Sequence, residues 1–160
     1  MTLLRCFGLG VEEFWFGDTR VAIRLPASVG RDGISIVEHW MPAGEATPLH
    51  VHRTEDEAFH VLEGRMRFLV GGLTRFAGPG ETLLAPKDVP HQFRVVSPEG
   101  ARCLTITRGG DFEALLRGMG RPAEGPGLPP PAPVTAERLS ALAEACARHG
   151  IEVIGAPLAA

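Results

Sequence analysis

The chain has 160 residues, of which 44% are hydrophobic and 22% are charged, and its formal net charge is −3. This length fits one domain with or without an appendage, and the apolar share suffices for a core, which excludes global disorder. The acidic balance argues against nucleic-acid binding, and no stretch is apolar enough for a membrane span.

The N-terminal residues and the cysteines indicate the compartment. Charged residues interrupt the apolar residues near the N-terminus and no small-residue cleavage site follows, so we expect no signal peptide. Cys6, Cys103 and Cys146 are odd in number and far apart, which is typical of reduced thiols rather than a disulfide framework. We therefore expect a cytoplasmic protein.

Residues 11–108 carry closely spaced strand patterns, in which apolar and polar side chains alternate. Gly71-Gly72 between two such patterns predicts a hairpin. The chain's 20 glycines and 14 prolines suit short strands with tight turns and exclude a helix bundle for most of its length. This spacing predicts an all-β sandwich or small barrel. The expected strands cover residues 20–25, 33–40, 65–70, 73–76, 81–85, 90–96 and 101–108.

The pattern changes after residue 110. Asp111 is placed to cap a short helix over residues 112–117, and residues 121–133 form a linker with many prolines. Thr135 is placed to cap a second helix that ends near Gly150. We expect residues 1–110 to form the barrel. Residues 111–160 then provide a linker and a helix that packs on the barrel or on a neighbouring subunit.

Four side chains are potential metal ligands: His50, His52, Glu57 and His91. His50 and His52 project from the same face of an extended strand. The residues after them are polar and can make a turn. If the segment that begins at Glu57 pairs back as a hairpin, its carboxylate lies against both imidazoles. Three imidazoles and one carboxylate suit one divalent transition ion, which could be Fe, Mn, Ni, Co, Cu or Zn. Four ligands leave positions open on such an ion, which favours a catalytic site.

Neighbouring residues offer alternatives to this set. Glu55 and Asp56 could compete with Glu57 as the carboxylate ligand. His60 has the opposite strand parity to Glu57, so we expect it outside the barrel. His39 has no partner nearby in sequence, and we interpret it as a surface or structural residue.

Residues 44–64 resemble the first motif of the cupin superfamily. Gly44, His50, His52, Glu57 and Gly64 occupy every fixed position of that motif, and the spacing from the carboxylate to Gly64 favours Glu57 over its acidic neighbours. The resemblance implies a double-stranded β-helix, or jelly-roll barrel, with a short C-terminal helical extension. It also implies that His50, His52, Glu57 and His91 are the metal ligands.

Residues 80–95 resemble the second cupin motif, in which Gly80, Pro86 and His91 match. Asp88 replaces a glycine, which a left-handed backbone conformation would accommodate, and Val95 replaces an asparagine without removing a ligand. The segments around the motifs are most similar to the quercetin-dioxygenase-like group of small bacterial cupins.

Strand parity predicts an apolar substrate pocket around the ion, since side chains at alternate positions share a face with the ligands. Ile36 and Trp40 on the preceding strand complete the expected lining, although residues 42–48 break their parity relative to His50. The pocket residues expected from these strands are Phe59, Met66, Phe68, Phe93, Val95, Ile36 and Trp40.

These features favour a metal-dependent dioxygenase that acts on a small aromatic or enolic substrate, with Glu57 as the catalytic base that the resemblance implies. The same ligands would serve a non-oxidative isomerase, cyclase or lyase, or a binding module for small molecules. The expected partners are the substrate and dioxygen, without nucleic acid or membrane. A homodimer is expected through residues 1–25 and the C-terminal helix, because a lone barrel exposes sheet edges.

Overall fold

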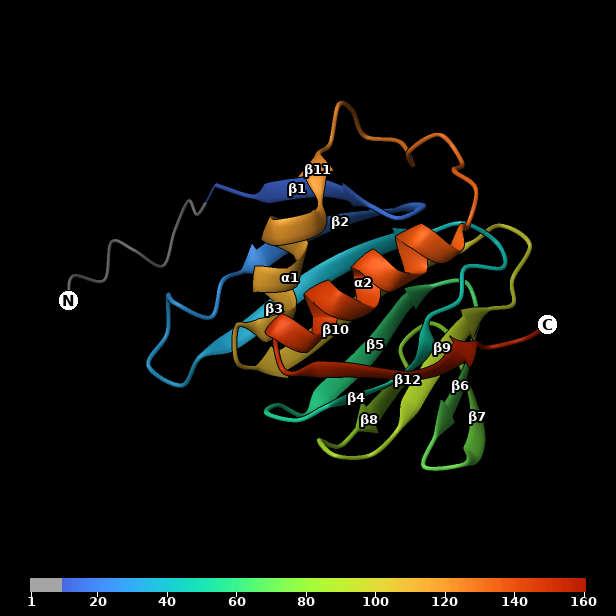
Figure 1. Cartoon of the computed structure of the whole chain (residues 1–160), viewed down its shortest axis with the longest axis horizontal. Helices are drawn as coiled ribbons and strands as arrows, with labels where there is room; N and C mark the ends of the chain where they lie inside the picture. Colours follow the sequence, from blue (N-terminus) through green and yellow to red (C-terminus); the bar gives the residue numbers. More distant parts are fainter. Residues whose placement is uncertain (1–9) are drawn as a thin grey trace.

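A computed structural model describes residues 10–160, and its strands form two antiparallel sheets (Figure 1). The order in the first sheet is β11-β1-β2-β3-β10-β5-β8, and in the second it is β12-β4-β9-β6-β7. This arrangement confirms the predicted all-β jelly roll with short helices. Cys6, the expected absence of a signal peptide and the start of the expected dimer segment 1–25 lie outside the described residues.

The strands of the first sheet are β1 (Glu12–Phe16), β2 (Thr19–Leu25), β3 (Ile34–Met41), β5 (Glu57–Glu63), β8 (Thr82–Ala85), β10 (Ala101–Arg108) and β11 (Arg121–Pro122). Those of the second are β4 (Pro48–His52), β6 (Met66–Val70), β7 (Leu73–Ala77), β9 (His91–Val95) and β12 (Ile151–Pro157). The helices are α1 (Asp111–Met119) and α2 (Ala136–Arg148).

The barrel core lies between the two sheets. The register pairs Phe59 with Thr105 and Thr105 with Val37, which fixes the inner face of the first sheet. On the second sheet Phe68 pairs with Phe93. Phe59, Phe68 and Phe93 pack with ring centroids 5.1–6.0 Å apart, so aromatic contacts join the sheets across the core.

The turns show why glycine is required at the motif position Gly64 and at the Gly71-Gly72 pair between the motifs. Gly71 and Gly72 both have positive φ, at 56° and 81°, and they connect β6 to β7 as the predicted hairpin. Gly64 also has positive φ, and a Cβ there would meet backbone atoms of Gly100 and Ala101. Asp88 is the one non-glycine residue with positive φ in the described part of the chain, at 63°, as its place in the second motif predicts.

Residues 53–56 do not form the expected hairpin. β4 pairs with β9 and β12 in the second sheet, whereas β5 pairs with β10 and β8 in the first. The segment is therefore a crossover between sheets, and Glu57 meets the histidines of β4 across the barrel rather than along a ladder. The sequence could not distinguish the two arrangements, because a polar four-residue connection suits both.

The C-terminal residues fill the side of the barrel where the first sheet extends beyond the second. Leu116 of α1 packs on Val21, Ile23 and Val37, which lie on the inner face of β2 and β3. Residues of α2 pack on Leu115 and on Ile151 of β12. Strand β12, which the sequence pattern does not predict, then pairs with β4.

The helix ends agree in part with the predicted caps. Thr135 accepts a hydrogen bond from the backbone N–H of Arg138 and caps α2 as predicted. Asp111 is the first residue of α1 rather than its cap, a position that Gly110 occupies. The Asp111 carboxylate instead accepts a hydrogen bond from the hydroxyl of Thr54.

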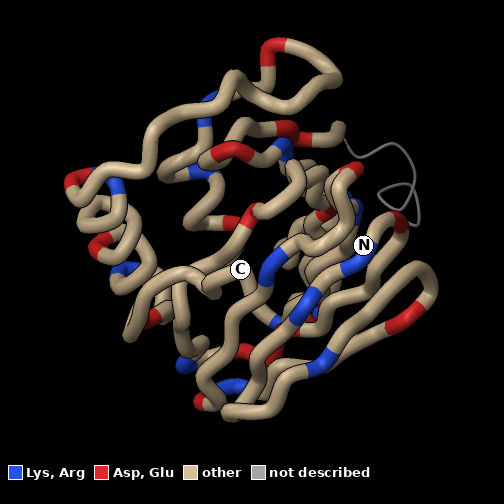
Figure 2. The backbone as a smooth tube through the Cα atoms, turned by 90° about the vertical axis from the view of Figure 1, so that its right-hand side faces the viewer, with Lys and Arg blue, Asp and Glu red and all other residues tan. Residues whose placement is uncertain are grey.

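Acidic and basic residues are interspersed over the molecule (Figure 2). Arg24 and Arg102, for example, both pair with the carboxylate of Glu38 on the outer face of the first sheet. No helix among residues 10–160 is long and apolar enough to cross a membrane.

Candidate metal centre

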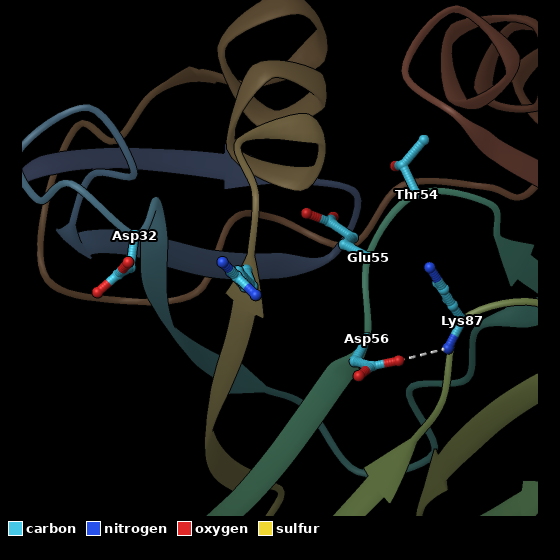
Figure 3. Close-up of a pocket in the computed structure, with 6 residues that line it drawn as sticks. Asp32, Thr54, Glu55, Asp56 and Lys87 are labelled. Carbon is cyan, nitrogen blue, oxygen red and sulfur yellow. Dashed lines mark hydrogen bonds between the residues drawn. The ribbon is translucent and has the colours of Figure 1, made fainter.

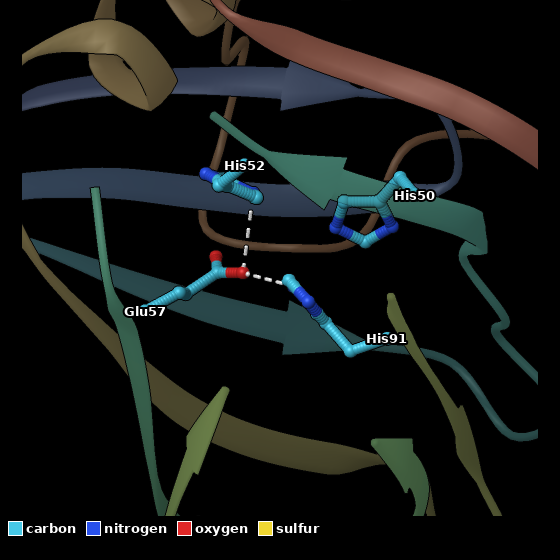
Figure 4. A group of neighbouring side chains, drawn as sticks. All are labelled: His50, His52, Glu57 and His91. Atoms are coloured by element: carbon cyan, nitrogen blue, oxygen red, sulfur yellow. Dashed lines mark hydrogen bonds and ion pairs between the residues drawn. The ribbon is translucent and has the colours of Figure 1, made fainter. Parts of the chain in front are cut away.

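Three strands bring four polar side chains together inside the barrel. β4 supplies His50 and His52, β5 supplies Glu57 and β9 supplies His91, and one potential ligand atom from each lies within 4.8 Å of all the others (Figure 4). The pairing of His50 with His91 across β4 and β9 sets the two imidazoles side by side. The sequence-predicted set therefore converges on one point.

The Glu57 carboxylate lies at the centre of this group. Its Oε2 atom is 2.9 Å from Nε2 of His91 and 3.3 Å from Nε2 of His52 (Figure 4). His52, Glu57 and His91 are buried, and His50 is half-buried. The cluster is thus shielded from bulk water, where its electrostatic interactions are strong.

An oxygen atom faces Nδ1 of each imidazole. Nδ1 of His50 lies 2.8 Å from the carbonyl oxygen of Pro48, and Nδ1 of His91 lies 2.9 Å from that of Val89. A carbonyl oxygen only accepts, so these contacts place the proton of a neutral imidazole on Nδ1. The lone pair of Nε2 then points toward the shared centre, as a metal ligand requires.

This arrangement calls for a cation. His91 has an acceptor oxygen beside each ring nitrogen, Val89 O at Nδ1 and Glu57 Oε2 at Nε2. A neutral imidazole has only one N–H, so at one of these two contacts a lone pair on nitrogen would face a lone pair on oxygen. A metal ion or an extra proton between the two atoms would remove this repulsion. The donor chemistry of the site therefore fits a bound cation.

The electrostatics agree with this view. Burial opposes ionisation of Glu57, but the imidazoles of His52 and His91 outweigh it and lower the pKa of Glu57 to about 2. Burial and the neighbouring His91 lower the pKa of His50 to about 4. At neutral pH the site therefore offers an ionised carboxylate and, at His50, a neutral imidazole. Such donors suit a divalent transition ion better than Mg²⁺ or Ca²⁺.

The neighbouring alternatives lie elsewhere. Glu55 is on the far side of His52, with Oε1 3.4 Å from Nδ1 of that ring. Asp56 is exposed and accepts a hydrogen bond from the backbone N–H of Lys87. His60 lies on the outer face of β5 as predicted, beside the hydroxyl of Thr82. Among the three consecutive acids, only Glu57 belongs to the cluster.

His39 is a structural residue of the interior. Its Nε2 lies 3.1 Å from the hydroxyl of Thr105, and its ring stacks on Phe112 of α1. Burial lowers the pKa of His39 to about 4, so the ring is neutral at physiological pH.

Most of the expected pocket residues are packed core. Five of the seven belong to one buried cluster, in which Met66, Phe68 and Val95 are almost fully covered: Phe59, Met66, Phe68, Phe93 and Val95. Among these five residues, Phe59 is the candidate for lining a pocket at the centre, because its ring centroid lies 6.2 Å from that of His91. A substrate contact for these five residues stays a prediction.

The expectation for Ile36 and Trp40 is wrong. Val37 and His39 occupy the inner face of β3, so Ile36 and Trp40 face outward. The guanidinium of Arg20 lies over the Trp40 ring, 4.2 Å from its centroid. Apolar residues on both faces of β3 hid its orientation from the sequence pattern.

A cavity of about 380 Å³ is bordered by Glu55 and its neighbours (Figure 3). Most of its lining residues have ionisable side chains, and none of the four clustered residues contributes to it. Glu55 joins the two regions, because it borders the cavity and contacts His52. The lining residues are Asp32, Thr54, Glu55, Asp56, Lys87 and Arg108.

Comparison with known proteins agrees with this geometry. The family model described as a cupin domain matches residues 37–107. Quercetin 2,3-dioxygenase of Bacillus subtilis (strain 168) is 30% identical over 119 residues, which is 74% of this chain and 35% of that protein. The chain therefore spans about a third of the length of this relative.

Solved structures show the same fold. KdgF from Halomonas sp. is 19% identical with a TM-score of 0.53, over 60% of this chain and 84% of that one. The polyketide cyclase RemF from Streptomyces resistomycificus is 25% identical with a TM-score of 0.50, over 67% of this chain and 78% of that one.

Proposed function

Because the chain belongs to the cupin superfamily, with its cupin domain at residues 37–107, we propose that it is a metal-dependent oxygenase for a small aromatic or enolic substrate. The observation that carries the proposal is the buried convergence of three imidazoles and one carboxylate. Similarity to quercetin 2,3-dioxygenase supports the oxidative chemistry and the substrate class.

His50, His52, Glu57 and His91 would hold one divalent transition ion. When bound, such an ion supplies Lewis acidity toward a substrate oxygen and, if it is redox-active, a route for electrons. His50 and His91 contribute oriented donors, because the carbonyl oxygens of Pro48 and Val89 keep the Nδ1 protons of these two rings away from the centre.

Glu57 would act as the general base. Its Oε2 atom interacts with two imidazoles, whereas no described side chain donates a hydrogen bond to Oε1. Oε1 is therefore the atom that would accept the proton of a substrate hydroxyl and return that proton later. The Phe59 ring beside His91 would keep water from this side of the substrate.

Oxygen consumption tests this proposal. With quercetin and a panel of other flavonols and enols, we expect uptake by ion-loaded protein and none after chelation. Glu57→Gln should lower the rate by about 10²–10⁴-fold at equal ion content, which is the usual contribution of a general base. Uptake no greater than that of chelated protein across the panel would refute the oxygenase assignment. Tight ligand binding without turnover, unchanged by Glu57→Gln, would identify a binding module.

A second candidate is a non-oxidative enzyme that uses the ion only as a Lewis acid, such as a cyclase, isomerase or lyase. The likeness to the polyketide cyclase RemF favours it. Turnover under anaerobic conditions with a redox-inert ion would distinguish it from the oxygenase, which needs dioxygen.

We also propose that the protein acts in the cytoplasm as a homodimer, with the contact at the edges of β7 and β8 instead of at residues 1–25 and the C-terminal helix. The free thiols of Cys103 and Cys146 suit a reducing compartment. β7 and β8 are the free edges of the two sheets. The groove between them is lined by Leu73, Phe76 and Leu84, whose exposed fractions are 60%, 52% and 54%. Arg75 and Glu81 border this groove, and within the described chain neither forms an ion pair. In a two-fold dimer each could pair with its opposite on the second copy.

Sedimentation velocity at micromolar concentration checks the dimer. We expect the parent chain to sediment as a dimer and Leu84→Glu as a monomer, because a buried unpaired charge opposes association. Ile154→Glu is the matched control, since Ile154 is 45% exposed on β12. A monomeric parent, or a dimeric Leu84→Glu variant, would contradict this surface.

A further inference from the structure

Glu55 is a buried acid with no conventional hydrogen bond. Glu55 lies in the crossover between β4 and β5 and is 2% exposed. Both of its carboxylate oxygens lack a hydrogen-bond partner. Buried carboxylates are normally paired, because leaving water without a compensating contact is unfavourable. Its position therefore requires an explanation that packing alone does not provide.

The Nδ1 atom of His52 is the complementary group. It too is buried without a hydrogen-bond partner, and it lies 3.4 Å from Oε1 of Glu55. One atom can donate a proton and the other can only accept one, so a small rotation would join them in a charge-assisted hydrogen bond.

The other two imidazoles show what this contact does. Nδ1 of His50 and of His91 each face the carbonyl of the residue two positions earlier, at 2.8 and 2.9 Å. His52 has no such carbonyl contact, and the carboxylate of Glu55 takes its place. Every imidazole of the cluster thus has an oxygen behind it, but only at His52 does that oxygen belong to a carboxyl group.

We propose that Glu55 is a positioning residue, which holds the proton of His52 on Nδ1 and directs Nε2 toward the metal centre. A carboxylate behind a metal-bound imidazole also raises the basicity of that ligand. This inference rests on the proposed metal-binding function, and it assigns Glu55 a role outside the ligand set.

The surroundings hold Glu55 in place. A Cβ on Gly109 would meet the carboxylate, so the glycine after β10 leaves the space that the acid occupies. Asp56 turns the other way, toward the backbone N–H of Lys87 (Figure 3). The two adjacent acids therefore differ in burial and partner, and Asp56 provides a matched control.

The test compares Glu55→Gln and Glu55→Ala with Asp56→Asn in the full chain. Zn²⁺ affinity is measured by competition with a chromophoric chelator, after circular dichroism has verified folding. We expect both Glu55 variants to bind Zn²⁺ about 10–100-fold more weakly, as is typical when an outer partner of a ligand is lost. Asp56→Asn should match the parent chain. Affinities of the Glu55 variants within about twofold of Asp56→Asn would overturn the proposal.

A second readout does not depend on the ion. In ¹⁵N NMR spectra of the metal-free chain at one fixed pH, we expect the Nδ1 atom of His52 to be protonated in the parent. In Glu55→Gln the Nδ1–H and Nε2–H forms should mix. A parent chain that binds no Zn²⁺ refutes metal binding, while the spectra still decide the role of Glu55. Identical His52 spectra in parent and variant would refute that role.

Discussion

His91→Ala is expected to weaken metal binding by at least about 100-fold, because removing a ligand costs more than removing an outer partner of one. The variant loses the imidazole whose Nε2 lies 2.9 Å from Glu57 Oε2. The carboxylate then keeps only the His52 contact on that atom, at 3.3 Å. Metal content after purification without an affinity tag, followed by chelator competition, measures the change.

His60→Ala is the control for this prediction. His60 is three residues after Glu57 on β5, but it lies on the outer face and contacts Thr82. Its loss should leave metal content unchanged. Equal metal content in His91→Ala and His60→Ala would show that the cluster does not hold the ion.

Phe68→Ala is expected to lower the free energy of unfolding by about 3–5 kcal/mol, the usual effect of removing a buried aromatic ring. Phe68 is 1% exposed, and its ring centroid lies 5.1 Å from Phe59 and 6.0 Å from Phe93. The change would open a cavity where the sheets meet. Urea unfolding of the chelator-treated chain, with linear extrapolation to water, measures it.

Ile34→Ala is the comparison for stability. Ile34 is 45% exposed at the start of β3, so its truncation should change the unfolding free energy by about 0.5 kcal/mol or less. If Phe68→Ala had as small an effect, the aromatic cluster would not be the main contact between the sheets.

The sequence predicted the barrel and the four clustered residues because their signals are local. Gly71-Gly72 specifies a hairpin through two positive φ angles, and H-x-H places two imidazoles on one face of a strand. Among the three consecutive acids, the spacing to Gly64 favours Glu57, and Glu57 is the acid that lies in the cluster. The structure explains why this motif position is a glycine, since Gly64 lies at a turn where a side chain would meet backbone atoms.

The orientation of β3, the crossover after His52 and the contact of Glu55 depend on distant segments of the chain, which the local sequence pattern does not show. The expected face of Ile36 and Trp40 is wrong, because β3 carries apolar residues on both sides. Only the register of β3 with β10 shows which side faces the barrel interior. The polar connection after His52 is equally compatible with a hairpin, and only the pairing of β4 with β9 and of β5 with β8 identifies it as a crossover. Glu55 was considered only as a competing ligand, and its contact with His52 follows from the fold of that crossover.

Strand β12 ties the centre to a distant part of the chain. Ile151 pairs with His52 and Val153 pairs with His50, so the strand that carries two of the clustered histidines is completed by residues 151–157. Without β12 this strand would present an unpaired edge on the side away from β9. The two histidines of β4 are therefore flanked by a strand that lies outside residues 37–107, the part of the chain that the cupin domain model matches.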